Sequence, residues 1–400
     1  GRLFLFSIGG FTFVVFKTYK MNDMKGKQGM VCMGLLLVLS SCHTGKQITA
    51  SGLQRKDFQT EVNGQHTDLF TLSNKQGMEV CITNYGARVV SILVPDRNGK
   101  REDVVCGFST ITEYMEQRQN FGSTVGRYIG RILNARFTLD GVEYKLVPNN
   151  GKSGHISHGG NPGFADRIWK VEQADTHRVC LSYLSPDGEN GFPGNLKVTL
   201  VYSLGEDDNA LDLTYEATTD APTVLNLSHH SFFNISGNFT KSVEDQQLWV
   251  DADRFTPYDD KKCVTGEYLP VAGTPLDFRM PHTIGECIDA DHPQLKVVNG
   301  YDHTWELNTK GDDTRPAAWV YDPASGRKME IFTTEPGMQI YTGNGLKGKM
   351  TGKGGIAYPF RSAVCFETMH FQDSPNQPGF PSTVLRPGEV FRSHTVYKFE

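Results

Sequence analysis

Two short segments, far apart in the chain, carry side chains suited to acid/base chemistry. Residues 226–234 contain His230, and residues 365–368 contain Glu367. The surrounding residues are mostly apolar or β-prone, and a polar side chain that is buried without a partner destabilises the folded protein. An imidazole and a carboxylate in such surroundings indicate a pair that transfers protons.

Three further polar side chains lie in loop-like contexts: Arg131, His158 and Asp302. Each is a weak signal by itself, because an isolated arginine is usually a surface charge, a His-Gly-Gly sequence is usually a turn, and an aspartate often caps one. His230 alone could be a satisfied core histidine, and Glu367 a paired structural acid. The joint occurrence of all five favours a functional site.

Composition and charge exclude some classes of function. The chain has 400 residues, of which 38% are hydrophobic and 21% charged, an ordinary globular balance. Its formal net charge is -5, and no long basic run would follow a phosphate backbone, so we predict no nucleic-acid partner. The 8 cysteines are scattered without a C-x-x-C pair, which favours isolated buried thiols over a zinc knuckle or a redox dithiol.

The region before residue 43 has the pattern of a secretory signal. Lys25 and Lys27 precede an apolar run at residues 31–39, and a Leu-Ser-Ser-Cys sequence ends at Cys42. The run is too short to span a bilayer. The ending resembles a bacterial lipobox, which implies that residues 21–42 are a lipoprotein signal peptide and that Cys42 is lipidated. We therefore expect a periplasmic or cell-envelope protein that meets the membrane only through this lipid anchor.

The remaining domain boundaries follow from composition. Residues 1–20 begin without Met, and we interpret them as an unstructured upstream extension. Residues 43–51 are predicted to be a linker. No low-complexity segment and no repeat of fixed period divides the chain after residue 52, so residues 52–400 are predicted to be a single domain.

Hydrophobic residues after residue 52 alternate with period two, with turn signals at short intervals, as in an antiparallel all-β protein. Residues 137–146 form a predicted hairpin around an Asp-Gly turn, and residues 196–202 and 211–215 flank an acidic loop. Residues 110–119 are the one modest helix candidate. We predict a large antiparallel β-sandwich with few short helices.

The ordered motifs of the chain resemble the aldose 1-epimerase, or galactose mutarotase, family from about Asn84 to Phe399. The resemblance implies a galactose mutarotase-like supersandwich and a small-molecule sugar substrate. The motifs that carry it are residues 84–88, 125–132, 158–160, 191–194, 226–234, 300–303, 336–344, 366–368 and 376–389.

Position by position, the resemblance implies that Glu367 is the general base and His230 the general acid. It also implies that the sugar is held by Arg131, His158, Asp302 and Gln339. The expected reaction interconverts the α and β anomers of free hexoses such as glucose and galactose.

The chemistry of ring opening agrees with that assignment. Opening a pyranose hemiacetal removes the proton of the anomeric hydroxyl and adds a proton to the ring oxygen, so one base and one acid suffice. Rotation about C1–C2 and reclosure deliver the other anomer, and no cofactor is required. A free imidazole with a pKa near ~6.5 is mostly neutral at neutral pH. We therefore expect a neighbouring negative charge, or the bound sugar, to keep His230 partly protonated.

Several positions depart from the family pattern or have open roles. His229 and Gly130 stand where the family often has Asn, so His229 could share the role of His230. The loop at residues 149–157 is altered, which bears on the placement of His158. The ring of Phe232 or of Tyr301 could face the C–H surface of the sugar.

Other functions remain open at this point. A carbohydrate-binding β-sandwich without turnover would lack Glu367 or His230, and both are present. A glycosidase needs two carboxylates about 5–10 Å apart, which Asp302 and Glu367 could supply. A hexose-phosphate epimerase would need basic residues beyond Arg127 and Arg131.

Metal binding and assembly are weakly signalled. Calcium is conceivable at acidic pairs such as Asp251 with Asp253 or Asp259 with Asp260, but neither fits a recognised loop, and turn carboxylates are the commoner explanation. We expect a monomer.

Overall fold

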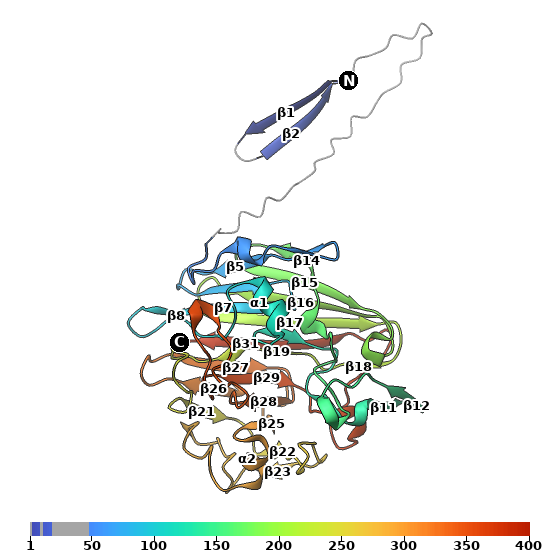
Figure 1. Ribbon diagram of the computed structural model, residues 1–400, viewed down its shortest axis with the longest axis vertical. Coiled ribbons are helices and arrows are strands. Elements are labelled where there is room, and N and C mark those ends of the chain that lie inside the picture. The colour runs from blue at the N-terminus through green and yellow to red at the C-terminus, as the bar shows by residue number, and fades with distance from the viewer. Residues whose placement is uncertain (1, 9–10, 18–47) are drawn as a thin grey trace. The chain divides into compact units, whose positions relative to one another are not determined.

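The computed structural model describes residues 2–8, 11–17 and 48–400, and it divides into two compact units, residues 1–42 and 43–400 (Figure 1). In the first unit, β1 (Arg2–Ile8) pairs antiparallel with β2 (Phe11–Lys17). Both arms are rich in residues that favour strands. Cys42 and the signal pattern lie outside the described residues.

The second unit contains a nine-stranded antiparallel sheet. Its strands run in the order β14-β15-β16-β17-β31-β27-β26-β21-β24. The strands are β14 (Lys170–Ala174), β15 (Arg178–Ser185), β16 (Leu196–Leu204), β17 (Ala210–Thr219), β31 (Phe391–Phe399), β27 (Lys328–Thr333), β26 (Ala318–Tyr321), β21 (Gln247–Val250) and β24 (His282–Thr283).

Two smaller sheets accompany it. A six-stranded sheet has the order β20-β29-β28-β25-β22-β23, and a four-stranded sheet has the order β5-β6-β7-β8. The strands of the first are β20 (Phe232–Phe233), β29 (Val364–Met369), β28 (Gly337–Tyr341), β25 (Asp302–Glu306), β22 (Arg254–Thr256) and β23 (Leu269–Pro270). Those of the second are β5 (Leu69–Ser73), β6 (Glu79–Thr83), β7 (Arg88–Pro95) and β8 (Arg101–Asp103).

Short strand pairs and helices complete the unit. The pairs are β9 (Ser123–Val125) with β19 (Ser228–His230), β10 (Arg131–Ile132) with β13 (Ile156–Ser157), β11 (Arg136–Leu139) with β12 (Val142–Lys145), β18 (Thr223–Val224) with β30 (Val384–Leu385), and β3 (Glu61–Val62) with β4 (Gln65–His66). The α-helices are α1 (Ile111–Gln117) and α2 (Pro293–Val298). Single 3₁₀ turns lie at Arg55–Phe58, Leu133–Ala135, Gly151–Ser153, Phe164–Asp166, Glu189–Gly191, Lys353–Gly355 and Ser374–Asn376.

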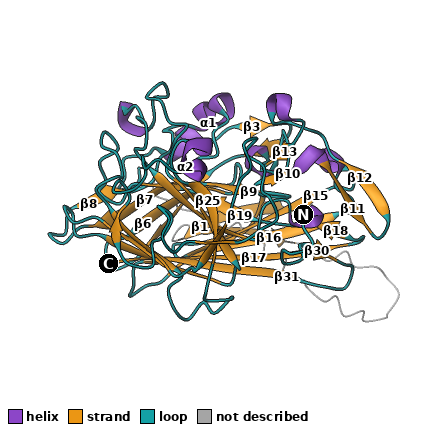
Figure 2. Ribbon diagram, turned by 90° about the horizontal axis from the view of Figure 1, so that it is seen from below, coloured by secondary structure: helices purple, strands orange, loops and turns teal. Residues whose placement is uncertain are grey.

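The main core joins the three large sheets. Along β16 the side chains alternate between buried and more exposed, so one face of the strand packs inward. Leu200 of this strand belongs to the same hydrophobic cluster as Phe366 of β29 and Val80 of β6. The predicted all-β sandwich with few short helices is confirmed, and most helical turns lie on one side of the strand layers (Figure 2).

Two local sequence patterns coincide with the elements that they predicted. The Asp-Gly hairpin is β11–β12, with Leu139 opposite Val142. Helix α1 begins after Thr110, whose hydroxyl accepts a hydrogen bond from the backbone N–H of Glu113 while the Glu113 carboxylate accepts one from that of Thr110. This capping box explains why the helix starts there.

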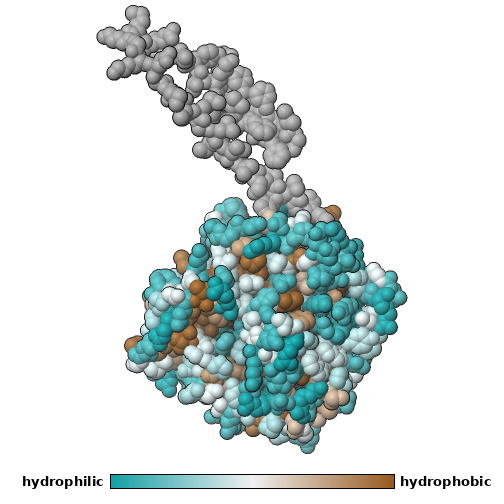
Figure 3. All heavy atoms as spheres, turned by 180° about the vertical axis from the view of Figure 1, so that it is seen from behind, coloured by the Kyte–Doolittle hydropathy of each residue, from teal (hydrophilic) through white to brown (hydrophobic). Residues whose placement is uncertain are grey.

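The surface of the second unit is mixed. On the face shown in Figure 3, hydrophilic side chains predominate and hydrophobic ones form small patches between them. Within the residues that the structure describes, no helix has the length and apolar character needed to cross a membrane.

The burial of side chains in the main core predicts the effect of truncating one of them. Leu200 is fully buried, so Leu200→Ala should lower the free energy of unfolding by about 2–5 kcal/mol through lost transfer energy and the cavity left behind. Urea unfolding followed by tryptophan fluorescence measures this loss. The control Val142→Ala, at a position that is 52% exposed, should change it by less than about 0.5 kcal/mol; equal losses in the two variants would contradict the assignment of the core.

Candidate active site

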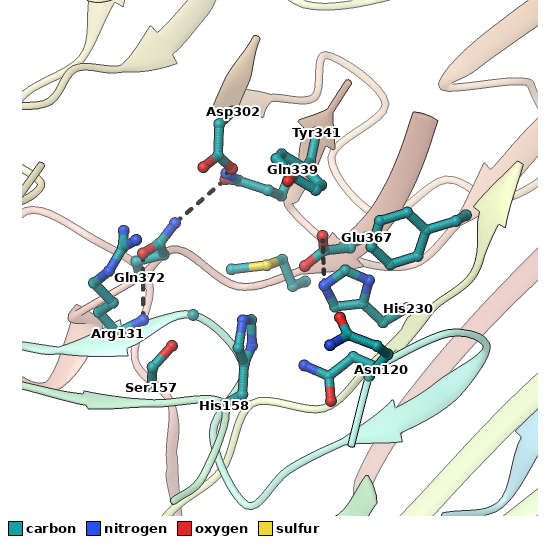
Figure 4. Close-up of a pocket in the computed structure, with 14 residues that line it drawn as sticks. Asn120, Arg131, Ser157, His158, His230, Asp302, Gln339, Tyr341, Glu367 and Gln372 are labelled. Carbon is teal, nitrogen blue, oxygen red and sulfur yellow. Dashed lines mark hydrogen bonds and ion pairs between the residues drawn. The ribbon is translucent and has the colours of Figure 1, made fainter. Parts of the chain in front are cut away.

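All six residues predicted to catalyse the reaction or bind the sugar line one cavity of about 250 Å³ (Figure 4). The cavity is polar, and it is bounded by strands of the six-stranded sheet on one side and by the β10–β13 loops on the other. Its lining comprises Gln119, Asn120, Gly130, Arg131, Ser157, His158, His230, Phe232, Asp302, Gln339, Tyr341, Glu367, Met369 and Gln372.

Three adjacent strands supply Glu367, Gln339 and Asp302. Gln339 of β28 lies directly opposite Glu367 of β29, and Asp302 of β25 lies opposite Tyr341, two residues further along β28. Because side chains alternate between the two faces of a strand, these polar groups share one face. Their neighbours Phe366 and Ile340 point to the other face and belong to the main hydrophobic core.

His230 reaches Glu367 because the chain crosses between two strand pairs at this point. Its segment pairs with β9 through β19, and two residues later Phe232 of β20 pairs with Cys365 of β29. The His230 Nε2 atom lies 3.4 Å from Oε1 of Glu367. The imidazole also stacks on the ring of Phe232, with centroids 5.0 Å apart and an interplanar angle of 14°. Both members of the pair are buried.

Arg131 and His158 come from the β10–β13 pair, in which Arg131 lies opposite Ser157. The backbone N–H of His158 donates to the carbonyl of Gly130 at 2.9 Å. Residues 158–160 form a tight turn, with φ of 53° at His158 and 78° at Gly159. A Cβ atom at Gly159 would lie 2.0 Å from the carbonyl oxygen of Gly126, so only glycine fits.

Gln372 joins the two walls of the cavity, and no motif identified in the sequence includes it. Its Oε1 accepts from the backbone N–H of Arg131 at 3.2 Å, and its Nε2 donates to the hydroxyl of Tyr258 at 2.7 Å and to Oε1 of Gln339 at 3.4 Å. Gln339 in turn donates to Asp302 Oδ1 at 2.7 Å. These hydrogen bonds orient the side chains that face the sugar.

Sequence reasoning also missed Asn120, Ser157 and Tyr341 in the lining. Tyr341 lies in the recognised motif at residues 336–344, and the alternation of β28 places it on the same face as Gln339. Counting two residues along the strand from Gln339 could therefore have identified Tyr341. Gln372 and Asn120 lie in loops, where no periodicity indicates the direction of a side chain.

Burial shifts the proton affinities of the catalytic pair in opposite directions. Desolvation, with the charge of Asp302 as a second cause, raises the pKa of Glu367 well above its ordinary 4.5. Desolvation, with His158 as a second cause, lowers the pKa of His230 well below its ordinary 6.5. Both shifts therefore favour the uncharged forms of the pair, a carboxylic acid beside a neutral imidazole. The carboxyl group expected to supply a negative charge lies beside His230, but burial disfavours its ionised form, so it does not keep His230 protonated by itself.

The neighbouring histidines have distinct environments. Desolvation and the charge of Arg131 lower the pKa of His158 to about 4, so this side chain is neutral. His229 does not line the cavity; its Nε2 lies 2.7 Å from the hydroxyl oxygen of Ser231 and its Nδ1 lies 3.4 Å from that of Tyr202. His229 is therefore a buried structural histidine, and a shared role with His230 has no geometric support.

Two other open questions are decided by packing. Phe232 lines the cavity, whereas Tyr301 is fully buried in the core, where its hydroxyl donates to the carbonyl of Pro275 at 2.9 Å. Arg127 is also fully buried; its guanidinium donates to backbone carbonyls and to the hydroxyl of Ser185. Arg131 is thus the arginine that faces the cavity, which gives little support to a phosphate site.

The acidic pairs that could bind calcium have other partners. Asp251 and Asp253 accept hydrogen bonds from Arg315 and Arg279, which neutralise them, and Asp259 accepts from backbone N–H groups in its own turn. Within the described part of the chain, the one group of three suitable donors is His230, Cys365 and Glu367, whose ligand atoms lie within 4.8 Å of one another. Burial raises the pKa of the Cys365 thiol, so a metal there would have to displace its proton.

Comparison with known proteins agrees with this geometry. The sequence model of the family described as aldose 1-epimerase matches residues 68–398. The chain belongs to the aldose 1-epimerase family. This family member is 39% identical over 330 residues to a galactose mutarotase of Sus scrofa, covering 82% of the chain and 93% of the relative. It is 36% identical over 339 residues to an aldose 1-epimerase of Escherichia coli (strain K12), covering 84% and 96%.

Solved structures of aldose 1-epimerase relatives share the fold. An aldose epimerase homologue from C. elegans has a TM-score of 0.77 at 31% identity, covering 84% of this chain and 99% of the homologue. A galactose 1-epimerase from Lactobacillus acidophilus has a TM-score of 0.74 at 28% identity, covering 85% and 96%. The six-stranded and nine-stranded sheets therefore form a galactose mutarotase-like fold.

The raised pKa of Glu367 predicts a pH-dependent cost to stability. Above its ordinary value of 4.5 the unfolded chain releases the proton that the folded protein retains, so this residue makes stability fall as pH rises. A glutamine at this position cannot ionise, so Glu367→Gln lacks this pH-dependent loss of stability. The free energy of unfolding of Glu367→Gln minus that of the wild type should therefore increase with pH, by at most about 1.4 kcal/mol per pH unit.

Urea unfolding of both proteins between about pH 5 and about pH 8 measures the difference. The control Glu116→Gln, at an exposed position of α1, should run parallel to the wild type. A difference for Glu367→Gln that stays flat or falls with rising pH would contradict the burial-driven shift.

Proposed function

We propose that this aldose 1-epimerase interconverts the α and β anomers of free hexoses such as glucose and galactose, with Glu367 as general base and His230 as general acid. The observation that carries the proposal is the 3.4 Å approach of His230 Nε2 to Glu367 Oε1 inside a polar cavity of about 250 Å³. A base and an acid that share one small cavity can act on the two oxygens of a single hemiacetal carbon.

The number of protons on the pair is the same before and after ring opening. The reactive form has the Glu367 carboxylate beside the His230 imidazolium. The carboxylate removes the proton of the anomeric hydroxyl, the imidazolium gives its proton to the ring oxygen, and the C1–O5 bond breaks. The aldehyde forms, and the pair becomes a carboxylic acid and a neutral imidazole. Rotation about C1–C2 exposes the other face of the aldehyde, and the reverse transfers close the ring.

Both pKa shifts favour these transfers. A carboxylate with a raised pKa is a stronger base, and an imidazolium with a lowered pKa is a stronger acid. The charged form of the pair is disfavoured in an empty, desolvated cavity, so hydrogen bonds from the bound sugar supply part of its stabilisation. Ring opening then returns the pair to its uncharged form.

The other lining residues provide the contacts that hold a pyranose. Arg131 presents a planar guanidinium that can bridge two adjacent hydroxyls, which a lysine would do less specifically. Asp302 and Gln339, already joined by a 2.7 Å hydrogen bond, present oriented acceptors and donors. The Phe232 ring and Met369 supply apolar surface for the C–H face of the sugar.

The proposal predicts the effect of removing either proton-transfer group. Glu367→Gln and His230→Asn should each lower kcat about 10²–10⁴-fold, because each loses one positioned acid or base. Polarimetry on freshly dissolved α-D-glucose and α-D-galactose measures this change. Lys241→Ala, at an exposed position outside the cavity, is the control and should match the wild type.

Three results would overturn the proposal. In the first, both variants equilibrate the anomers as fast as the wild type while retaining their fold. In the second, the wild type releases sugar from aryl glycosides faster than it equilibrates anomers, which would indicate a hydrolase. Sugar binding without turnover in the wild type would instead indicate a binding module.

We further propose that the protein is lipid-anchored in the cell envelope through Cys42. The lipobox-like ending of the apolar run at residues 31–39 supports this location. In a bacterial host, wild-type protein should partition into the detergent phase of Triton X-114, and Cys42→Ser should move to the aqueous phase with its mutarotase activity intact. The control Cys32→Ser should behave as the wild type. A wild-type protein found only in the aqueous phase would contradict the anchor.

A further inference from the structure

Three side chains with different metal-binding atoms meet beside the catalytic cavity. They are the His230 imidazole, the Glu367 carboxyl and the Cys365 thiol, and we call them the three-donor group. One donor atom from each lies within 4.8 Å of the donor atoms of the other two. All three residues are buried, and Cys365 forms no disulfide. The proposed ring opening uses the imidazole and the carboxyl but gives the thiol no role.

The strand register explains why the thiol lies beside the proton-transfer pair. Cys365 and Glu367 are two residues apart on β29, so their side chains share one face of the strand. In the sheet, Cys365 lies between Phe232 of β20 and Tyr341 of β28, and both of these residues line the cavity. The thiol is fully buried and is not part of the lining. A cation bound by all three donors would therefore enter from the cavity past Glu367 and His230 and reach the sulfur behind them.

The distances fit a small tetrahedral ion such as Zn²⁺. Zinc holds nitrogen and oxygen ligands at about 2.0–2.2 Å and sulfur ligands at about 2.3 Å, which places a nitrogen and an oxygen ligand about 3.4 Å apart. His230 Nε2 and Glu367 Oε1 already lie 3.4 Å apart (Figure 4). The sulfur must approach by at most about 1.2 Å to reach its ideal separation of about 3.6 Å, which small changes of side-chain torsion can supply. The fourth position of the ion then faces the cavity and takes a water molecule.

The charges of the three-donor group also suit a divalent cation. As a carboxylic acid, a thiol and a neutral imidazole, the three side chains carry no net charge. A bound Zn²⁺ replaces the proton of the carboxyl and the proton of the thiol, and both protons pass to the solvent. The dication and the two anions again sum to zero, so binding adds no net charge to a place where charge is costly to bury. The sulfur and the imidazole nitrogen favour zinc over magnesium or calcium, which prefer oxygen ligands.

The surroundings of the three-donor group predict reversible binding. A histidine that binds a metal usually donates a hydrogen bond from its other ring nitrogen, and this contact strengthens metal binding. Within the described residues, Nδ1 of His230 has no hydrogen-bond partner, and the ring is held instead by stacking on Phe232. The three-donor group therefore lacks one of the contacts that strengthen structural zinc sites.

We propose that the three-donor group is an inhibitory Zn²⁺ site. The ion bonds to the carboxylate of Glu367, the imidazole of His230 and the thiolate of Cys365. With the metal bound, neither the base nor the acid can transfer a proton, and the anomeric hydroxyl of the sugar loses its place between them. Zinc and sugar therefore exclude each other, so the inhibition is competitive. The loss of activity rests on the proposed roles of Glu367 and His230, whereas the binding of the metal does not.

The first experiment measures inhibition. Polarimetry on freshly dissolved α-D-glucose gives kcat and KM at increasing ZnCl₂, with protein that carries no histidine tag and a buffer that does not chelate metals. Zinc should raise the apparent KM and leave kcat unchanged, and EDTA should restore the original KM. Cys365→Ala removes one ligand but neither proton-transfer group, so the inhibition constant of zinc should rise at least about tenfold. Cys365→Ser should act in the same way, and it replaces the alanine variant if that variant does not fold.

Cys106→Ala is the matched control. Cys106 is also fully buried, and its backbone N–H donates to the carbonyl of Phe232 at 2.8 Å, so it lies next to β20 without belonging to the three-donor group. This variant should keep the wild-type inhibition constant. Without zinc, the variants at positions 106 and 365 should retain kcat/KM within about threefold of the wild type.

The second experiment measures binding directly with Co²⁺, which can replace zinc in tetrahedral sites. A thiolate bound to Co²⁺ gives a charge-transfer absorption in the near ultraviolet. The wild type and Cys106→Ala should show this absorption, Cys365→Ala should not, and added Zn²⁺ should abolish it. Glu367→Gln keeps the thiol but loses the carboxylate, so it should bind Co²⁺ at least about tenfold more weakly than the wild type.

The proposal is overturned if about 1 mM Zn²⁺ leaves the activity of the wild type unchanged. It is also overturned if both Cys365 variants are inhibited like the wild type, or if the wild type shows no thiolate-to-cobalt absorption. Failure of the proposed function would look different. A protein that does not accelerate the equilibration of glucose anomers would still show the cobalt absorption.

Discussion

The site depends on one buried contact, the 3.4 Å approach of the Glu367 carboxyl to the His230 imidazole. Removing both groups from water makes charge unfavourable on either of them. The same desolvation strengthens the base and the acid once the pair is charged, so the condition that costs stability also supports proton transfer. A glutamate–histidine pair at the surface would have pKa values closer to the ordinary ones. Its carboxylate would then be a weaker base and its imidazolium a weaker acid.

The surrounding sheet is what makes such a buried pair tolerable. Strands β25, β28 and β29 alternate polar side chains toward the cavity with Ile340, Phe366 and other apolar side chains toward the core. On the cavity face, Asp302, Gln339 and Gln372 are hydrogen-bonded to one another. These bonds satisfy many of the polar atoms that line the cavity. Rigid strands therefore present the base and the sugar-binding groups, while loops from β10 and β13 supply the opposite wall.

Much of this arrangement could be predicted from the sequence. Period-two patterning and turn residues indicated an antiparallel sandwich, and the β11–β12 hairpin formed at its Asp-Gly turn. The motifs that contain Arg131, His158, His230, Asp302, Gln339 and Glu367 identified six residues that line one cavity. Their roles were implied by the resemblance to the aldose 1-epimerase family, because each residue type by itself was a weak signal. Alternation in the strands could also have indicated Tyr341.

Other features were decided only by the tertiary structure. Gln372 lies in a loop, so the direction of its side chain depends on contacts with distant segments, such as the backbone N–H of Arg131. The separate roles of His229 and His230, and of Phe232 and Tyr301, depend on which face of a packed sheet each side chain meets. The sequence by itself determined which chemical groups were available and the period of their strands. The distances between those groups, their burial and hence their proton affinities arise only when sheets far apart in the chain pack together, because desolvation is a property of the assembled environment.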